Sequence, residues 1–262
     1  MAGQQFSFDD GEAYERMMGT WSRLVGDIFL DWLAPRPGQR WIDVGCGNGA
    51  FTELLTERCA PAEVHGVDPS EGQLAFARSR PCGALAKFHQ GSAEALPFPE
   101  SRFDAATMAL VIFFVPDPAK GVAEMVRVVG SGGTVATYAW DILGGGFPFE
   151  PIQAELRAMG FKPPLPPRSD ASRMDALLDL WSRAGLEAIE TREITVQRTF
   201  ADFDDFWTTT NLSSSLGPFV ATMTPGDVEL LKTRTRARLP ADASGRITYE
   251  ASANAIKGRV SK

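Results

Sequence analysis

Three glycines that follow a short apolar run are the feature of this sequence most able to support chemistry. The run occupies residues 41–44 (WIDV), the glycines are Gly45, Gly47 and Gly49, and an apolar helical pattern begins at Phe51. A strand, a glycine turn and a helix N-terminus in this order point backbone N–H groups at a ligand, and glycine lets the ligand approach the main chain. We therefore expect a nucleotide-binding corner.

Two carboxylates indicate which nucleotide suits this corner. Asp43 stands just before the glycines, and Asp68 lies nineteen residues beyond Gly49, at the end of the next apolar run. An acid placed like Asp68 accepts hydrogen bonds from both ribose hydroxyls of an adenosine ligand. A carboxylate at Asp43 repels a pyrophosphate and attracts an ammonium or sulfonium group. Since Ala50 can complete a dinucleotide fingerprint, a nicotinamide cofactor stays an alternative.

Alternating strand and helix patterns must position these groups. Runs of strand length occupy residues 41–44, 63–68, 86–90, 103–110 (continued by the apolar residues 111–115) and 134–140, with helical patterns or turns between them. Such alternation predicts a mostly parallel sheet covered on both faces. Ligands of these sheets bind at the carboxyl ends of the strands, where we expect residues 43–49, Asp68, Ser92 and Met108.

The flanking segments predict additional layers around this sheet. Residues 8–33 carry an apolar stripe at helical spacing, and residues 151–159 and 171–184 read as helices. Strand patterns at residues 186–200 and 246–259 enclose a helical stretch of about forty residues, which predicts a hairpin with a large insertion. Insertions of this kind are typical of lids and caps.

The chain resembles a class I S-adenosylmethionine-dependent methyltransferase of the small-molecule, type 11-like group. Residues 43–49 (DVGCGNG) are similar to that family's first motif and residues 67–70 (VDPS) to its acidic second position. Residues 91–98 (GSAEALPF) resemble the adenine-side segment, and residues 124–133 the helix and turn before the fifth strand. These matches span residues 37–140 in the family's order.

The resemblance implies an α/β, Rossmann-like, doubly wound sheet of seven mostly parallel strands in the order 3-2-1-4-5-7-6. The last strand is expected to be antiparallel, with a helical cap inserted between the last two strands. The implied organisation is an N-terminal helical lid (1–36), a cofactor-binding core (37–200), a cap insertion (201–245) and the last strand of the core sheet (246–262).

The resemblance also implies S-adenosylmethionine as the cofactor and S-adenosylhomocysteine as the product. Asp43 is expected near the methionine ammonium group, Asp68 at the ribose and Pro69 on the adenine. The cofactor-binding residues that it implies are Asp43, Gly45, Cys46, Gly47, Gly49, Asp68, Pro69, Ser92, Ala93, Met108 and Ala109, with Tyr14 and Met18 from a helix that closes over the cofactor.

No catalytic residue stands out, because a sulfonium cofactor arrives activated and alignment with exclusion of water suffices. Core packing explains His65, Phe113 and Phe114 at least as well as catalysis does, and the same holds for His89. For Tyr138, Trp140 and Asp141, and for Phe203, Phe206 and Trp207 of the insertion, a role at the acceptor and a structural role both stay open. A non-catalytic cofactor-binding protein is a further alternative.

Composition narrows the partners to a small-molecule methyl acceptor. The net charge is −7, and an Asn/Asp-Pro-Pro-aromatic tetrad is absent after the fourth strand, so a nucleic-acid substrate is not expected.

Cys46, Cys59 and Cys82 show no metal spacing, which predicts no metal site and suits a reducing compartment. The first residues lack a signal-peptide pattern and no apolar run reaches membrane-spanning length, so we expect a cytoplasmic protein without membrane contact.

Overall fold

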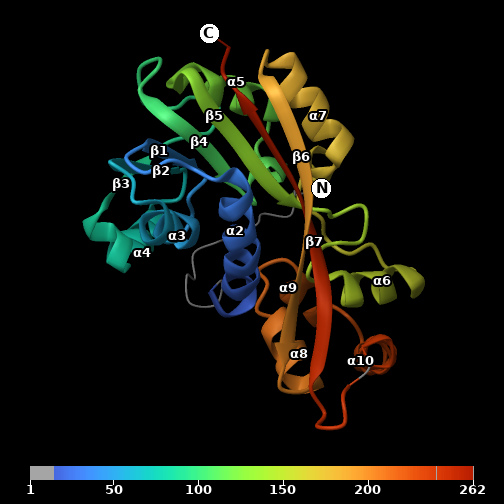
Figure 1. Cartoon of the computed structure of the whole chain (residues 1–262). Coiled ribbons are helices and arrows are strands. Elements are labelled where there is room, and N and C mark those ends of the chain that lie inside the picture. The colour runs from blue at the N-terminus through green and yellow to red at the C-terminus, as the bar shows by residue number, and fades with distance from the viewer. Residues whose placement is uncertain (1–14, 240, 262) are drawn as a thin grey trace.

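A seven-stranded sheet forms the centre of the molecule, which is known from a computed structural model that describes residues 15–239 and 241–261. The strands are β1 Arg40–Val44, β2 Glu63–Asp68, β3 Ala86–Gln90, β4 Phe103–Ala109, β5 Val129–Trp140, β6 Glu187–Phe200 and β7 Ile247–Arg259. Their order is β3-β2-β1-β4-β5-β7-β6 (Figure 1). The first five strands pair in parallel and β7 is antiparallel to both neighbours, so the predicted fold class is confirmed.

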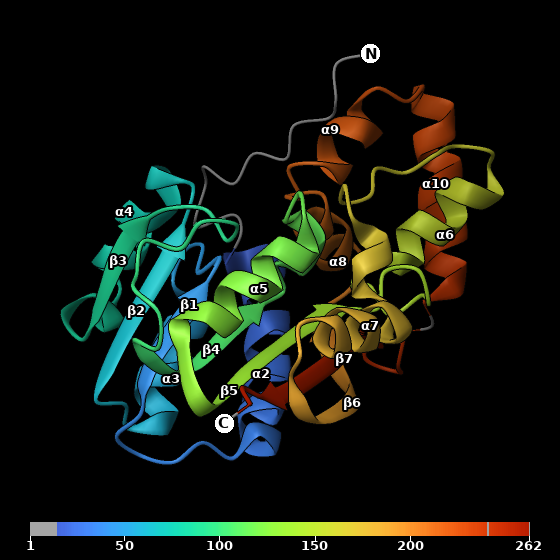
Figure 2. The same ribbon diagram turned by 90° about the horizontal axis from the view of Figure 1, so that it is seen from above.

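Helices cover both faces of this sheet. The α-helices are α2 Thr20–Leu33, α3 Ala50–Cys59, α4 Glu71–Ser79, α5 Pro118–Val128, α6 Glu150–Ala158, α7 Met174–Arg183, α8 Phe203–Thr210, α9 Leu216–Ala221 and α10 Pro225–Arg238. Figure 2 shows α2 and α3 on one face and α5 and α7 on the other. The helices α8, α9 and α10 lie between β6 and β7 in the chain, as the predicted cap insertion requires. No helix of residues 15–239 and 241–261 has the length and apolarity to cross a membrane.

Aromatic packing fixes α2 against the middle of the sheet. Trp21, Val25 and Phe29, from the predicted apolar stripe, are fully buried. The Phe29 ring centroid lies 4.7 Å from that of Tyr138 on β5, and Phe51 of α3 completes the cluster at 5.7 Å from Tyr138. Burial of these large side chains stabilises the layer at roughly 1.5–3 kcal/mol each. The division of the chain into lid, core and cap stays a prediction.

Two segments differ from the sequence-based expectation. The apolar residues 111–115 do not extend the fourth strand, because Leu110 has a positive φ of 60° and a 3-10 turn, η3 Ile112–Phe114, follows. The turn expected at residues 131–133 is a bulge inside β5, whose pairing with β4 shifts between Phe103 and Ala105. The additional residues of β5 interrupt its ladder with β4 locally, and pairing resumes at Ala105 and Thr134.

Candidate cofactor site

A cavity of about 890 Å³ opens at the carboxyl ends of β1, β2 and β4. Of the residues implied for the cofactor, those that line it are Asp43, Gly45, Cys46, Gly47, Asp68, Pro69, Ser92, Ala93 and Ala109. Segments far apart in the sequence therefore meet where parallel topology places them.

The remaining implied residues have other positions. Gly49 caps the N-terminus of α3 and packs on α4, where a Cβ would lie 2.9 Å from Ala77 Cβ. Met108 is buried within β4 and is not part of the cavity lining, and its carbonyl accepts a hydrogen bond from the Thr137 hydroxyl. Met18 is buried outside the cavity lining, and Tyr14 lies outside the described residues.

The glycine turn has a conformation that side chains would oppose. Gly45, Gly47 and Gly49 have φ values of 74°, 50° and 81°. The N–H groups of Gly45 and Cys46 both donate to the Val67 carbonyl, at 2.7 and 3.1 Å, which ties the turn to β2. The chain thus turns sharply from β1 into α3 beneath the cavity floor.

Asp43 supplies a buried carboxylate at the end of β1. Its Oδ2 accepts from the Thr52 hydroxyl at 2.6 Å, whereas its fully buried Oδ1 has no partner among the described residues. Burial raises the pKa of Asp43 to about 7, an effect that the Thr52 hydrogen bond opposes and the nearby Asp68 carboxylate reinforces. A cation entering the cavity would stabilise the ionised form of this group.

Asp68 ends β2 and holds the glycine turn from inside the cavity. Its Oδ2 accepts from the Gly47 N–H and its Oδ1 from the Ser70 N–H, each at 2.9 Å. Burial raises its pKa, and the two N–H groups offset part of that rise. Since a carboxylate has about four acceptor positions, Asp68 retains capacity for two further donors such as ribose hydroxyls.

The segment of residues 92–98 forms one wall of the cavity and is fixed from α5. Glu124 Oε2 accepts from the Leu96 N–H at 2.7 Å, and Arg127 donates to the Phe98 carbonyl at 2.8 Å. The same arginine pairs with Glu124. The Glu124–Arg127 pair, seen in the sequence only as part of a motif, therefore positions Ser92 and Ala93.

The lining also includes residues that sequence reasoning did not assign to a site. They are Ser22, Asn48, Ala50, Phe51, Val67, Ser70, Gln73, Leu110, Val111, Val115, Pro116 and Pro167, together with Phe114 and Tyr138, which it had considered. Asn48 and Ser70 lie inside the quoted motifs at residues 43–49 and 67–70, but nothing local signals Ser22 or Pro167. Among the described residues that line the cavity there is no Lys, Arg or His.

Other candidates from the sequence lie away from the cavity. His65 Nδ1 and His89 Nε2 are 2.8 Å apart on adjacent strands. The other ring nitrogen of His65, Nε2, lies 2.8 Å from Glu63 Oε1. In the insertion, Phe206 packs against Phe200 and Tyr249. Cys46 does line the cavity, but burial raises the pKa of its thiol well above the ordinary value and keeps it protonated.

Among residues 15–239 and 241–261, no group of three His, Cys, Asp or Glu side chains is placed to hold a metal ion. The chemistry of the cavity rests instead on two carboxylates, backbone N–H groups and apolar walls.

We expect Gly45→Ala to weaken cofactor binding by about tenfold and Gly132→Ala to leave it unchanged. The two glycines share nearly the same φ, 74° and 75°, so alanine strains both backbones by roughly 1–2 kcal/mol. Only at Gly45 would the new Cβ lie 2.4 Å from Val111, whereas nothing lies within 4 Å at Gly132. Titration calorimetry and thermal melts of both variants check this, and equal affinities would contradict it.

Part of the chain is similar to known methyltransferases. Residues 42–137 match the family described as methyltransferase domain. The ubiquinone/menaquinone biosynthesis C-methyltransferase UbiE of Cereibacter sphaeroides is 36% identical over 121 residues, which cover 45% of this chain and 48% of that protein. The ubiquinone biosynthesis O-methyltransferase of Methylococcus capsulatus is 41% identical over 101 residues, covering 37% of this chain and 42% of that protein. The matched part of the chain thus spans about half the length of these relatives.

Solved structures share the whole fold. The phosphoethanolamine N-methyltransferase 2 of Haemonchus contortus, in complex with S-adenosyl-L-methionine, aligns with a TM-score of 0.60 and 18% identity. The alignment covers 99% of this chain and 59% of that one. At this level of identity the likeness concerns the fold alone.

Proposed function

We propose that this chain, whose residues 42–137 form a class I S-adenosylmethionine-dependent methyltransferase domain, binds S-adenosylmethionine in the cavity at the ends of β1, β2 and β4. It would transfer the methyl group to a small neutral acceptor. The observation that carries this proposal is Asp43, a buried carboxylate beside the glycine turn with one oxygen that no described residue pairs with. A cationic ligand would supply the missing partner.

The donor and acceptor set of the cavity suits each part of this cofactor. Asp43 would face the ammonium group, and the glycine turn would follow the methionine portion. Asp68 would accept from the ribose hydroxyls with the lone pairs that Gly47 and Ser70 leave open. Pro69 and the wall of Ser92 and Ala93 would enclose the adenine.

Catalysis would depend on alignment and on exclusion of water. When bound, the cofactor would supply an activated methyl group, which an acceptor lone pair or carbanion would attack in line while the CH3–S bond breaks and S-adenosylhomocysteine leaves. The chain would orient the acceptor against apolar surfaces from Phe51, Leu110 and Val111 and keep water out. Holding the reactants in such an orientation contributes roughly 7–11 kcal/mol in favourable intramolecular reactions.

The lining of the cavity favours an uncharged, partly aromatic acceptor. Beyond Asp43 and Asp68, the described lining residues are neutral at pH 7, and Phe51, Phe114 and Tyr138 provide ring faces. Two of the relatives are named for ubiquinone or menaquinone biosynthesis, so we propose a hydroxylated aromatic ring such as a quinol as the acceptor class. A cytoplasmic location without nucleic-acid partners stays part of the proposal.

Calorimetry with S-adenosylmethionine, S-adenosylhomocysteine and NAD tests the cofactor. We expect binding of the first two ligands at micromolar or lower concentration and none of NAD. Tight binding of NAD with no binding of the adenosylmethionine pair would instead favour an oxidoreductase.

A transfer assay with labelled methyl groups tests the acceptor class. Short-chain demethylated quinols should take up label, and charged amines of similar size should not. The described cavity lining has no acidic side chain to pair with an amine except Asp43 and Asp68, which the cofactor would occupy. Firm cofactor binding without transfer to any neutral acceptor in a cell extract would favour a non-catalytic binding protein.

A further inference from the structure

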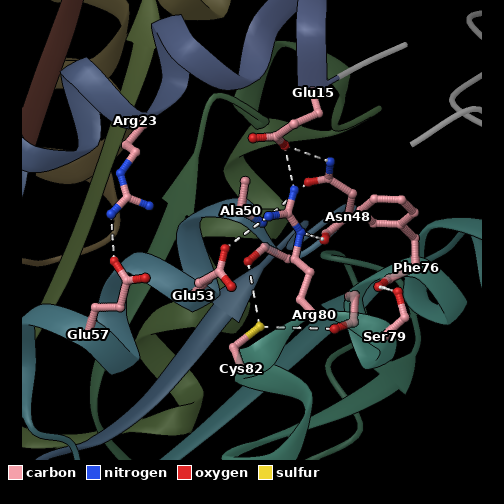
Figure 3. Close-up of polar contacts among 12 residues, drawn as sticks. Glu15, Arg23, Asn48, Ala50, Glu53, Glu57, Phe76, Ser79, Arg80 and Cys82 are labelled. Carbon is pink, nitrogen blue, oxygen red and sulfur yellow. Dashed lines mark hydrogen bonds and ion pairs between the residues drawn. The ribbon is translucent and has the colours of Figure 1, made fainter. Parts of the chain in front are cut away.

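A largely buried arginine, which is not part of the cavity lining, contacts the glycine turn. Arg80 ends α4 with only 13% of its side chain exposed, and it reaches three elements (Figure 3). Its Nε donates to the Asn48 carbonyl at 2.7 Å and its Nη1 to Glu53 at 2.9 Å. Its Nη2 pairs with Glu15. One guanidinium thus links the turn, α3 and the start of the N-terminal helix.

Glu15 belongs to a π-helical turn, Glu15–Gly19, that leads into α2. Its Oε2 also lies 3.4 Å from Asn48 Nδ2, so it contacts the same turn residue as Arg80. The side chain passes over Gly19, where a Cβ would lie 2.5 Å from Glu15 Cδ. Gly19 therefore leaves the path that Glu15 needs to reach the turn. Single π-turns occur often at functional sites.

A second arginine, Arg198 of β6, holds the backbone of this π-turn. Arg198 of β6 donates to the carbonyls of Met17 and Arg16 at 2.9 and 3.0 Å. Its guanidinium lies over the Phe200 ring at 4.4 Å. The π-turn is thereby fixed at its backbone by Arg198, while its Glu15 side chain is held at the glycine turn.

We propose that Arg80 is a positioning residue for the cofactor and that Glu15 couples the start of the N-terminal helix to it. Asn48 sits between two left-handed glycines and lines the cavity, so its peptide orientation shapes the floor of the site. Arg80 fixes that peptide through the carbonyl, and Asp68 fixes the preceding N–H of Gly47 from inside. If Glu15 leaves this site, Arg80 keeps its bond to Glu53, but the glycine turn loses the contacts of Glu15 with Arg80 and Asn48.

This inference rests on the proposed function, because its consequence is slow release of the cofactor. Preorganisation of a binding loop raises affinity by lowering the cost of ordering it. A docked Glu15 should therefore slow dissociation of the cofactor and its product, whereas an undocked one should hasten it.

The chain offers a matched control for the test. Arg23 of α2 pairs with Glu57 of α3 at 2.6 Å, so this ion pair joins the N-terminal helix to α3 without touching the turn (Figure 3). The variants are Glu15→Gln, Arg80→Lys and the control Glu57→Gln. Arg80→Lys keeps the charge, but its single nitrogen cannot reproduce contacts that Arg80 makes from three different nitrogens.

Binding of S-adenosylhomocysteine by calorimetry, its dissociation rate by stopped-flow and thermal melts provide the readout. We expect dissociation to become about fivefold faster in Glu15→Gln and about tenfold faster in Arg80→Lys, with Glu57→Gln within twofold of the unmodified chain. In the double variant Glu15→Gln/Arg80→Lys the increase in the dissociation rate should be smaller than the product of the two single increases, because both changes act on Asn48.

The outcomes separate the two proposals. Equal dissociation rates for Glu15→Gln and Glu57→Gln, at equal melting temperatures, would overturn the coupling even if Arg80→Lys failed to fold. An unmodified chain that binds neither S-adenosylmethionine nor S-adenosylhomocysteine would instead overturn the proposed function and the coupling with it.

Discussion

Replacing Asp68 by Ala should weaken binding of S-adenosylmethionine by about 100-fold. Part of this loss comes from the two ribose hydroxyls, because hydrogen bonds to a charged group contribute about 1.5–3 kcal/mol. The rest comes from the turn itself. Asp68 satisfies the N–H groups of Gly47 and Ser70, so the variant leaves both without an acceptor and frees the glycine turn to reorient.

A control and a modified ligand separate these contributions. Asp104 lies near the start of β4, at the end of the strands away from the cavity, and accepts from the Arg40 N–H at 2.8 Å. Asp104→Ala should therefore lower stability and leave cofactor affinity unchanged. A product analogue without ribose hydroxyls should bind the unmodified chain weakly, and in Asp68→Ala it should lose only the part of the affinity that the turn contributes. If the analogue and the natural product lose affinity equally in the variant, Asp68 does not hold the ribose.

The sheet and the floor of the site followed from short-range sequence patterns. β2 and β3 have the predicted bounds, and the turn at Gly45 was placed by three glycines within five residues. Parallel topology then brings Asp43, Asp68 and Ser92 to one edge without any knowledge of side-chain contacts. Local periodicity and the carboxyl-end rule were therefore sufficient for this half of the site.

The remaining wall depends on contacts that no spacing encodes. Ser22 reaches the cavity from a helix whose stripe predicts only packing, and Pro167 reaches it from a connection whose prolines predict only stiffness. Met108 illustrates the reverse case, since it lies in the predicted strand but is not part of the cavity lining, and its carbonyl accepts from the Thr137 hydroxyl. Arg80 lay at an unremarkable helix end, and only the fold brings it to Asn48.

Asp43→Asn should stabilise the cofactor-free protein at pH 8 and at the same time weaken cofactor binding by about 30-fold. In the folded chain the pKa of Asp43 is raised from an ordinary value of 3.8 to about 7, because the ionised carboxylate is buried. The folded state therefore binds the proton more tightly, and stability falls as pH rises from about 4 to 7. An amide carries no such penalty, and its oxygen can still accept from Thr52.

The Asp43 pKa shift limits the gain in unfolding free energy of Asp43→Asn at pH 8 to about 4 kcal/mol. This gain should vanish near pH 4. Denaturant titrations across this range measure it. Asp104→Asn is the control of opposite sign, because the Arg40 guanidinium lowers the pKa of Asp104, so its charge supports the fold at neutral pH. That variant should be less stable than the unmodified chain at pH 8 and bind the cofactor normally.

Proton release on binding tests the same carboxylate from the ligand side. At pH 6 the cofactor-free Asp43 is mostly protonated, and a cationic ligand that requires the ionised form should expel up to about one proton. The binding enthalpy should then depend on the ionisation enthalpy of the buffer. This dependence should disappear in Asp43→Asn and persist in Asp104→Asn. An unmodified chain whose binding enthalpy is the same in every buffer at pH 6 would show that the ammonium group does not lie at Asp43.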